Sequence, residues 1–499
     1  MRLLPIFKRA AKKDFFTASQ AAVADTGLRR KLENATGRHL EHVAATRAEF
    51  PPYDSERDTS RRIKEDAIAR LDDLLIQLKE NLEANGCRVF VAADAAEARK
   101  YIVDLARERG ARRVVKGKSM ATEEIELNAA LAAAGCEVVE TDLGEYIVQL
   151  RGERPSHIIT PAIHLSKEDI GELFHEKLDI PYTAEPEALT AVARERLREV
   201  FLAADMGVTG ANFAIAETGT LVLVENEGNG RMSSTLPEIF VAVMGIEKVI
   251  PSMADLSHFL EVLARTATGQ KLTTYTNFVS GPRRAGEADG PREVHVVMID
   301  NGRSAMLADP VLREALYCLR CGACLNVCPI YRRVGGHAYG STYPGPIGSI
   351  VSPSLFGGAT ATLPFASTLC GACREICPVK IDIPRILLHL RWKETADKDG
   401  TGKGDPALPT PIWPRSAHRA RSGLKAFSRL AKHPLTMRVM GRIAALALWP
   451  FARRGYVRWM PPPFGNWTSV RDFPVPRLRR WGKARNRPRG VAANNGTQA

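Results

Sequence analysis

The sequence predicts an α/β fold built on a parallel sheet, followed by a smaller helical module and a basic tail. Between residues 66 and 302, short apolar runs alternate with amphipathic helical stretches, a pattern typical of βαβ units. Seven of the nine cysteines lie between Cys318 and Cys377, in a stretch with helical flanks. From Pro411 onward, nineteen Lys and Arg accompany a single acid, Asp472, so the net charge of +14 gathers at one end.

The order of the elements follows from the apolar periodicity. Leucines at three- and four-residue steps predict a helix that Asn85-Gly86 ends. Strands are predicted at 88–92, 113–115, 137–139, 248–251 and 293–299, and helices at 15–32, 38–50, 64–85, 95–109, 123–134, 312–317, 423–430 and 437–449. Glycine and proline predict a turn at 210–225, a polar loop at 226–234 and a mostly loop segment at 331–366.

These patterns divide the chain into six regions. They are a helical N-terminal region (1–65), the α/β domain (66–302), the cysteine-rich module (303–395), a flexible linker (396–410), a basic helical region (411–476) and a disordered tail (477–499).

The first cysteine run has the spacing of an iron–sulfur protein. It reads C-x2-C-x2-C-x3-C-P, as in bacterial two-cluster ferredoxins, where three thiolates hold one cubane and the fourth holds its neighbour. We therefore expect two [4Fe-4S] clusters. Cluster 1 is assigned to Cys318, Cys321, Cys324 and Cys377, and cluster 2 to Cys328, Cys370 and Cys373. The helical flanks favour an α-helical two-cluster ferredoxin-like module over the compact β-hairpin kind.

The second cysteine run departs from this pattern. A full motif would place a cysteine at position 367, where the chain has Ser367. The fourth iron of cluster 2 is thus left to Ser367, a water or an outside ligand, and is open or labile. A zinc ribbon fits seven cysteines poorly, because zinc takes four ligands. Disulfides are disfavoured because no secretory signal is recognisable.

Several polar residues of the α/β domain are candidates for binding or acid–base work. Lys116-Gly-Lys118-Ser follows a predicted strand but lacks the full phosphate-loop signature, which leaves a weaker anion site or two solvated lysines. Glu217, Glu225 and Glu227 lie in glycine-rich turns and, with Lys118, could share one cleft. Loop acids are more often solvated, so this catalytic alternative is the weaker one.

Five segments carry a resemblance to a known family: Lys116-Gly-Lys-Ser-Met, Glu123-Glu, Glu140-Thr-Asp-Leu-Gly-Glu-Tyr-Ile, Ala216-Glu-Thr-Gly-Thr and Ser233-Ser-Thr-Leu-Pro. They look like the domain shared by the lactate-utilisation B and C proteins, the LUD-type domain. With the ferredoxin-type run behind them and Phe464-Gly-Asn-Trp467 in the tail, nearly the whole chain resembles the lactate-utilisation B (LutB) family. The resemblance implies a NagB/RpiA/CoA-transferase-like core and an electron-transfer role, with partner subunits, in oxidising L-lactate to pyruvate.

Three functions compete. The first is an electron-transfer component, because two clusters move single electrons and no dinucleotide fingerprint is present. The resemblance implies lactate as the electron donor. The second is direct catalysis in the α/β domain on a small hydroxy acid or an acyl or sugar-phosphate-like ligand. The third is a scaffold stabilised by its clusters.

The basic tail predicts an interaction surface rather than a membrane span. No run approaches the ~18 apolar residues of a transmembrane helix, so we expect a cytoplasmic protein. Residues 443–451 are the most apolar part of the tail and would dock on an acidic partner subunit or lie at a membrane surface. Nucleic acid is not expected, because no RNA-binding motif or helix-turn-helix accompanies the charge.

Overall fold

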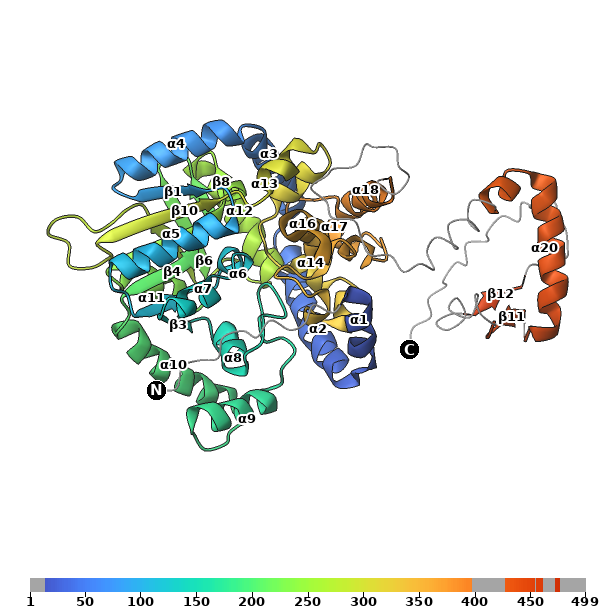
Figure 1. Cartoon of the computed structure of the whole chain (residues 1–499), viewed down its shortest axis with the longest axis horizontal. Helices are drawn as coiled ribbons and strands as arrows, with labels where there is room; N and C mark the ends of the chain where they lie inside the picture. The colour runs from blue at the N-terminus through green and yellow to red at the C-terminus, as the bar shows by residue number, and fades with distance from the viewer. Residues whose placement is uncertain (1–13, 397–426, 454, 461–471, 476–499) are drawn as a thin grey trace, which may run out of the picture. The chain divides into compact units, whose positions relative to one another are not determined.

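The computed structural model describes residues 14–396, 427–453, 455–460 and 472–475 (Figure 1). The chain forms two compact units, which divide after Pro411. Nearly all of the predicted linker, the Phe464–Trp467 motif and the predicted disordered tail lie outside the described residues.

A six-stranded sheet forms the centre of the first unit. Its order is β1-β10-β7-β4-β2-β3, and every neighbouring pair runs parallel, which confirms the predicted parallel sheet. The strands are β1 (Arg88–Ala92), β2 (Arg113–Lys116), β3 (Glu137–Glu140), β4 (Met206–Gly210), β7 (Ile239–Gly245) and β10 (Glu293–Ile299). All residues of β7 are buried, as an inner strand covered on both faces requires.

A second sheet of four strands lies in the same unit; of these strands the sequence predicted only the one at 248–251, which is β8. Its order is β8-β5-β6-β9, with β5 and β8 parallel and the other pairs antiparallel. The strands are β5 (Phe213–Ile215), β6 (Thr220–Glu225), β8 (Val249–Ile250) and β9 (Tyr275–Val279). The predicted turn at 210–225 is thus a β5–β6 hairpin. Gly219 stands at the turn of this hairpin with a positive φ of 62°, which glycine adopts without strain. A side chain at this position would also clash with the backbone of Asn81.

Helices flank the parallel sheet, as βαβ connections require (Figure 1). They are α4 (Leu71–Ala84), α5 (Ala95–Glu108), α6 (Met120–Glu124), α7 (Leu127–Ala133), α8 (Leu143–Arg151), α9 (Lys167–Leu178), α10 (Pro186–Leu202), α11 (Asn229–Thr235), α12 (Met253–Ala267) and the short turn η1 (Ile246–Lys248). Alternate side chains of β7 enter different cores. Val241 packs with α5 and α7, whereas Phe240 and Met244 belong to a core that continues into the cysteine-rich module.

Several predicted helices are divided where a cap or a left-handed residue interrupts them. The N-terminal region holds α1 (Phe15–Ala24), α2 (Thr26–Ala48) and α3 (Tyr53–Ala69). Asp25 ends α1 and caps α2, because its carboxylate accepts the amide of Leu28. Glu126, with φ 51°, separates α6 from α7 in the segment predicted as one helix. The helix predicted at 64–85 is likewise two, α3 and α4.

The cysteine-rich module is helical, and no strand occurs among its described residues up to Ala396. Its elements are α13 (Arg303–Ala308), η2 (Leu312–Tyr317), α14 (Ala323–Asn326), α15 (Tyr331–Val334), η3 (His337–Tyr339), α16 (Gly345–Phe356), η4 (Gly357–Thr360), η5 (Leu363–Phe365), α17 (Ala372–Ile376) and α18 (Ile383–Ala396).

Two loop predictions were wrong. The segment 331–366 contains α16, because Pro346 stands in the first helical turn, where a proline needs no N–H partner. The segment 226–234 contains most of α11, which starts after Gly228.

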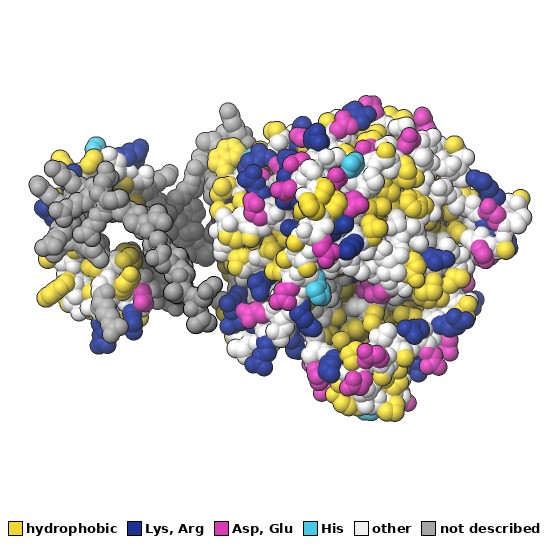
Figure 2. Space-filling view, turned by 180° about the vertical axis from the view of Figure 1, so that it is seen from behind, with side chains coloured by type: hydrophobic (Ala, Val, Ile, Leu, Met, Phe, Trp, Pro, Cys, Tyr) yellow, Lys and Arg dark blue, Asp and Glu magenta, His cyan; other side chains and the backbone are white. Residues whose placement is uncertain are grey.

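The second unit holds α20 (Pro434–Leu448), η7 (Trp449–Phe451), β11 (Tyr456–Val457) and β12 (Phe473–Pro474). Apolar residues on α20 remain exposed: Leu435, Val439, Ile443 and Leu446. Figure 2 shows hydrophobic side chains gathered on the described part of this unit. Within the described ranges, none of the helices combines the length and apolar character needed to cross a bilayer.

Candidate metal centre and adjoining cavity

Two similar turns present the seven cysteines of the module. Gly322 and Gly371 each follow a cysteine, adopt positive φ values of 73° and 87°, and start α14 and α17. These two helices contact each other, so the two cysteine runs meet. All nine cysteines of the chain are free thiols, and five of the seven in the module are buried. Cys370 is the exposed one.

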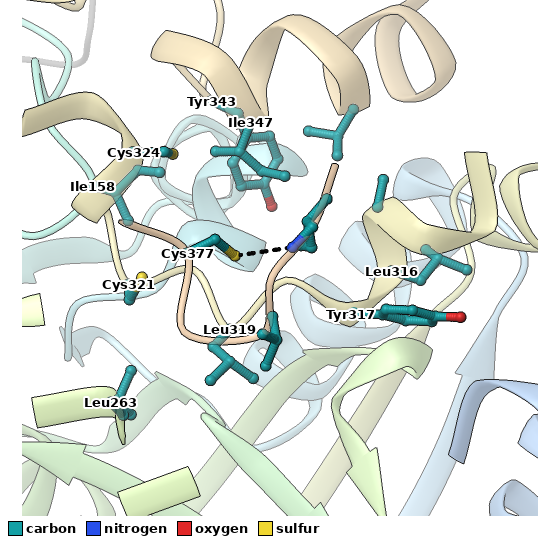
Figure 3. Close-up of a cluster of buried hydrophobic side chains, with 14 of the residues drawn as sticks. Ile158, Leu263, Leu316, Tyr317, Leu319, Cys321, Cys324, Tyr343, Ile347 and Cys377 are labelled. Carbon is teal, nitrogen blue, oxygen red and sulfur yellow. Dashed lines mark hydrogen bonds between the residues drawn. The ribbon is translucent and has the colours of Figure 1, made fainter. Parts of the chain in front are cut away.

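One group of thiols forms around Cys318. Burial raises the pKa of Cys377 to about 11, and the charge of Cys318 adds to this effect. Burial, Cys377 and Cys318 together raise the pKa of Cys321. Burial, Cys318 and Cys321 raise that of Cys324 far above its usual value. Figure 3 shows Cys321, Cys324 and Cys377 in one neighbourhood with Leu319.

A second group of thiols forms around Cys370. Burial and the charges of Cys328 and Cys370 together raise the pKa of Cys373 to about 12. Burial also raises the pKa of Cys328, and the charge of Cys370 adds to the effect. The charge of Cys373 reaches Cys324 as well, so the two groups adjoin.

The chemistry of this donor set fits iron–sulfur clusters. Buried thiols held close together ionise only when a cation compensates their charge, and soft thiolates select iron–sulfur or zinc centres. Amide N–H groups of Arg320, Tyr331 and Ile381 lie 3.3, 3.5 and 3.4 Å from the sulfurs of Cys318, Cys328 and Cys377; Figure 3 draws the last contact. Such N–H···S bonds accompany cluster ligation and tune its potential.

Ser367 lies three residues before Cys370, where the second cysteine run begins. Its hydroxyl accepts the amide of Leu369 at 3.1 Å, and its side chain is partly buried.

A cavity of about 260 Å³ adjoins the first group of thiols. It opens where β2, β4 and β7 end, the edge of a parallel sheet at which ligands bind. Its lining also includes Leu319, Arg320 and Cys321 of the first cysteine run. A ligand in this cavity would therefore contact the protein shell of cluster 1.

Comparisons with known proteins agree with this architecture. Residues 75–299 match the LUD domain, and residues 314–381 match the 4Fe-4S dicluster domain. The chain is 43% identical to a protein of Macrococcus caseolyticus named lactate utilization protein B, over 94% of this chain and 96% of the relative. The chain belongs to the lactate utilization protein B family.

Other relatives carry the same name. The protein of Bacillus subtilis is 45% identical over 87% of this chain and 88% of the relative, and that of Geobacillus thermodenitrificans is 41% identical over 97% and 98%. A crystal structure of a DUF162 family protein from Deinococcus radiodurans covers 46% of this chain and 98% of that chain, at 17% identity and a TM-score of 0.27.

The predicted polar candidates of this lactate utilization B family member are only partly brought together. Lys118, Glu225 and Glu227 line the cavity, whereas Glu217 does not. The Glu217 carboxylate instead accepts the amide of Met253 at 3.0 Å, at the start of α12. The expectation of one shared cleft is therefore wrong for Glu217.

The carboxylate of Glu225 accepts hydrogen bonds from three neighbouring groups. It accepts the amides of Gly230 and Arg231, both at 2.7 Å, and the side-chain amide of Asn277 at 2.9 Å. This arrangement stabilises the start of α11 and gives Glu225 a structural role.

The carboxyl group of Glu227 has a raised pKa. Burial of its carboxyl end and the charge of Asp142 raise its pKa to about 7, although the residue as a whole is exposed at the mouth of the cavity. It can exchange a proton near neutral pH.

The two lysines of the phosphate-loop-like segment differ in environment. Lys116 is fully buried, and its ammonium lies 2.9 Å from Glu140 and 3.1 Å from Glu123, so it is not a solvated lysine. Lys118 donates to the carbonyl of Ile159 and lies 3.5 Å from Asp142.

Three arginines of the N-terminal helices donate hydrogen bonds to backbone carbonyls in and just after the second cysteine run. Arg57 donates to the carbonyl of Cys377 at 2.8 Å, Arg47 to that of Ile376 at 2.9 Å and Arg61 to that of Lys380 at 2.7 Å. Sequence reasoning missed these contacts, because nothing local marks an arginine as the partner of a carbonyl more than three hundred residues away.

His157 and Lys248 are two further residues that the sequence did not single out. His157 is buried, and its Nδ1 accepts the amides of Ile159 and Thr160 at 3.0 and 3.1 Å, so the proton resides on Nε2. Its Nε2 lies beside Gly322 of the first cysteine run. Lys248 lines the cavity, and burial lowers its pKa to about 8.

Proposed function

We propose that this protein is the iron–sulfur electron-transfer component of a complex that oxidises L-lactate to pyruvate in the cytoplasm. Its relatives are named for lactate utilization, and its dicluster domain supplies one-electron carriers. The observation that carries the proposal is the arrangement of the thiols. One group is buried beside the cavity of the α/β domain, and the other reaches the surface at Cys370.

The proposed ligand sets follow the two groups of thiols. Cys318, Cys321, Cys324 and Cys377 would hold cluster 1. Cys328, Cys370 and Cys373 would hold cluster 2, with its fourth iron open or bound by Ser367. Oxidation of lactate to pyruvate releases two electrons and two protons, and two clusters that each carry one electron match that number.

We also propose that the α/β domain is related to sugar-phosphate isomerases and CoA transferases. The parallel sheet is the feature that supports this relationship.

Donor and acceptor proteins would meet this chain at separate surfaces. Cys370 marks the exposed end of the cluster pair. The apolar face of α20, in a region with nineteen basic residues, would dock on an acidic partner subunit.

The test begins with anaerobic iron and sulfide analysis of the full chain and EPR of its oxidised and reduced forms. About eight irons and a spectrum of two interacting clusters are expected; about seven irons with a three-iron signal would mark the labile site of cluster 2. Lactate should then reduce the clusters in the assembled complex and not in the isolated chain. Zinc, no metal, or clusters that lactate leaves oxidised in the complex would refute the proposal.

A further inference from the structure

The cavity beside cluster 1 contains hydrogen-bond donors that have no partner. The Thr209 hydroxyl, the Asn229 side-chain amide and one terminal nitrogen of Arg320 make no hydrogen bond among the described residues. Thr209 and Asn229 are 2% and 7% exposed, and the Arg320 side chain is 9% exposed. All three line the cavity. Buried polar groups without partners destabilise a fold, so donors gathered around one cavity indicate a ligand that accepts from them.

The acids of this cavity already have partners. Glu225 accepts from two backbone amides and from Asn277. Glu247 lies 2.5 Å from Arg303, and Asp142 lies 3.5 Å from Lys118. Glu247 and Asp142 are therefore paired with cations of the protein, whereas Glu225 and Glu227 form no ion pair among the described residues.

The cations are not all compensated. Lys248 lines the cavity and makes no hydrogen bond or ion pair with another described residue, and Arg320 reaches Glu247 only at 3.6 Å. Both residues lie near Cys318. The end of the cavity next to cluster 1 thus offers donors and positive charge, which together favour an anion.

We propose that this cavity binds the carboxylate of a small 2-hydroxy or 2-oxo acid, with Thr209, Asn229, Lys248 and Arg320 as its donors. The proposal deepens the function given above and rests on it for the class of acid. A monoanion suits the site better than a phosphate dianion, because Glu225 and Glu227 stand at the same cavity and would repel a second negative charge.

The position of the site gives it a direct relation to cluster 1. Leu319, Arg320 and Cys321 belong both to the cavity wall and to the first cysteine run. A carboxylate held by Arg320 would place a negative charge against the shell of cluster 1 and lower its reduction potential, since charge near a cluster tunes it. Ligand binding in the cavity can therefore be detected as a change in the properties of cluster 1 as well as by calorimetry.

The experiment is calorimetric titration of the anaerobically purified full chain with L-lactate, pyruvate and inorganic phosphate. We expect both carboxylates to bind and phosphate to bind at least tenfold more weakly. Thr209→Val keeps the shape and removes one donor, which weakens carboxylate binding by about tenfold. Asn229→Asp replaces the free donor with a negative charge and weakens binding by more than this.

A matched control and a second readout separate binding from folding. Asn34→Asp adds the same charge on exposed α2 and should leave carboxylate affinity unchanged. The visible absorbance of the clusters checks that each variant has folded. In the parent chain, pyruvate should shift the EPR spectrum of reduced cluster 1, and in Asn229→Asp this shift should be lost at the same pyruvate concentration.

Three results would overturn the proposal: no binding of either carboxylate by the cluster-loaded chain, tighter binding of phosphate, or unchanged affinity in both cavity variants. If lactate reduces the clusters in the complex while the chain binds no carboxylate, the site is wrong and the electron-transfer function stands. If the chain lacks clusters yet binds carboxylates in a Thr209-dependent way, the function is wrong and the site stands.

Discussion

Replacing Arg303 with Met should destabilise the first unit strongly. Arg303 begins α13 and is 2% exposed. Two of its nitrogens contact the two carboxylate oxygens of Glu124, both at 2.8 Å, and its Nε lies 2.5 Å from Glu247. The variant keeps most of the side-chain volume and leaves two buried carboxylates without their guanidinium.

The magnitude follows from the pKa of Glu247. Burial alone would raise it, but Arg303, Arg320 and Lys248 together outweigh burial and lower it from 4.5 to about 2, with Arg303 contributing most among the three. A shift of this size corresponds to about 3 kcal/mol at neutral pH. Breaking a buried ion pair by removing one partner costs about 3–5 kcal/mol. Since Arg303 is the largest of the cationic contributions at Glu247 and also pairs with Glu124, we expect a loss of about 3 kcal/mol in Arg303→Met.

The destabilisation should depend on pH with a definite sign. A carboxyl group whose folded pKa is lowered contributes stability above its unfolded pKa and loses that contribution as the pH falls toward about 2. Without Arg303, burial raises the pKa values of Glu124 and Glu247 instead, and their ionisation then opposes folding. The difference between parent and Arg303→Met should therefore grow as the pH rises from 5 to 8.

Anaerobic urea unfolding, followed by cluster absorbance and circular dichroism, measures this difference at each pH. Arg70→Met is the matched control, because the Arg70–Asp66 pair is about half exposed and its loss should cost less than about 1 kcal/mol. A loss of under 1 kcal/mol in Arg303→Met, or a loss that stays constant with pH, would refute the reasoning.

Three further outcomes are expected. His157→Leu should lower the reduction potential of cluster 1 in redox titration with little change in iron content, because a neutral N–H donor beside Gly322 is removed; an unchanged potential would contradict this role. Ser367→Cys should raise the iron retained after brief air exposure from about seven to about eight per chain, whereas Ser367→Ala should not. Gly336→Ala should lower the melting temperature by several degrees, because its Cβ would stand 1.8 Å from the carbonyl oxygen of Ser156.

The sequence predicted the parts of this protein that depend on local spacing. The strands β1 and β10 begin and end at the predicted residues, since short apolar runs bounded by turn residues mark them. The cysteine runs were also visible, because one tight turn must supply three ligands. The helix α16 was not predicted, because its glycines and prolines predict loop until one knows that Pro346 stands in a first turn.

The candidate site was predicted less well than the fold. Glu225 was interpreted as a possible acid or base, but the amides that occupy it come from a helix that the sequence did not predict. The sequence did not indicate that Arg320 lines the cavity, because this residue reaches the α/β domain from the cysteine-rich module. Contacts between such distant segments leave no periodic signal in a single sequence.

The hydrogen bonds between α3 and the second cysteine run have a consequence for biosynthesis. Arg57 and the carbonyl of Cys377 are 320 residues apart, so this contact forms only after the ribosome has made almost the whole first unit. The N-terminal helices therefore cannot complete their packing until the second cysteine run has been synthesised. Cluster 1 likewise cannot be completed before Cys377 has emerged from the ribosome. Cluster insertion and closure of the N-terminal helices are thus expected to be one late maturation event, and iron-starved cells should accumulate chains whose N-terminal helices are cut readily by proteases.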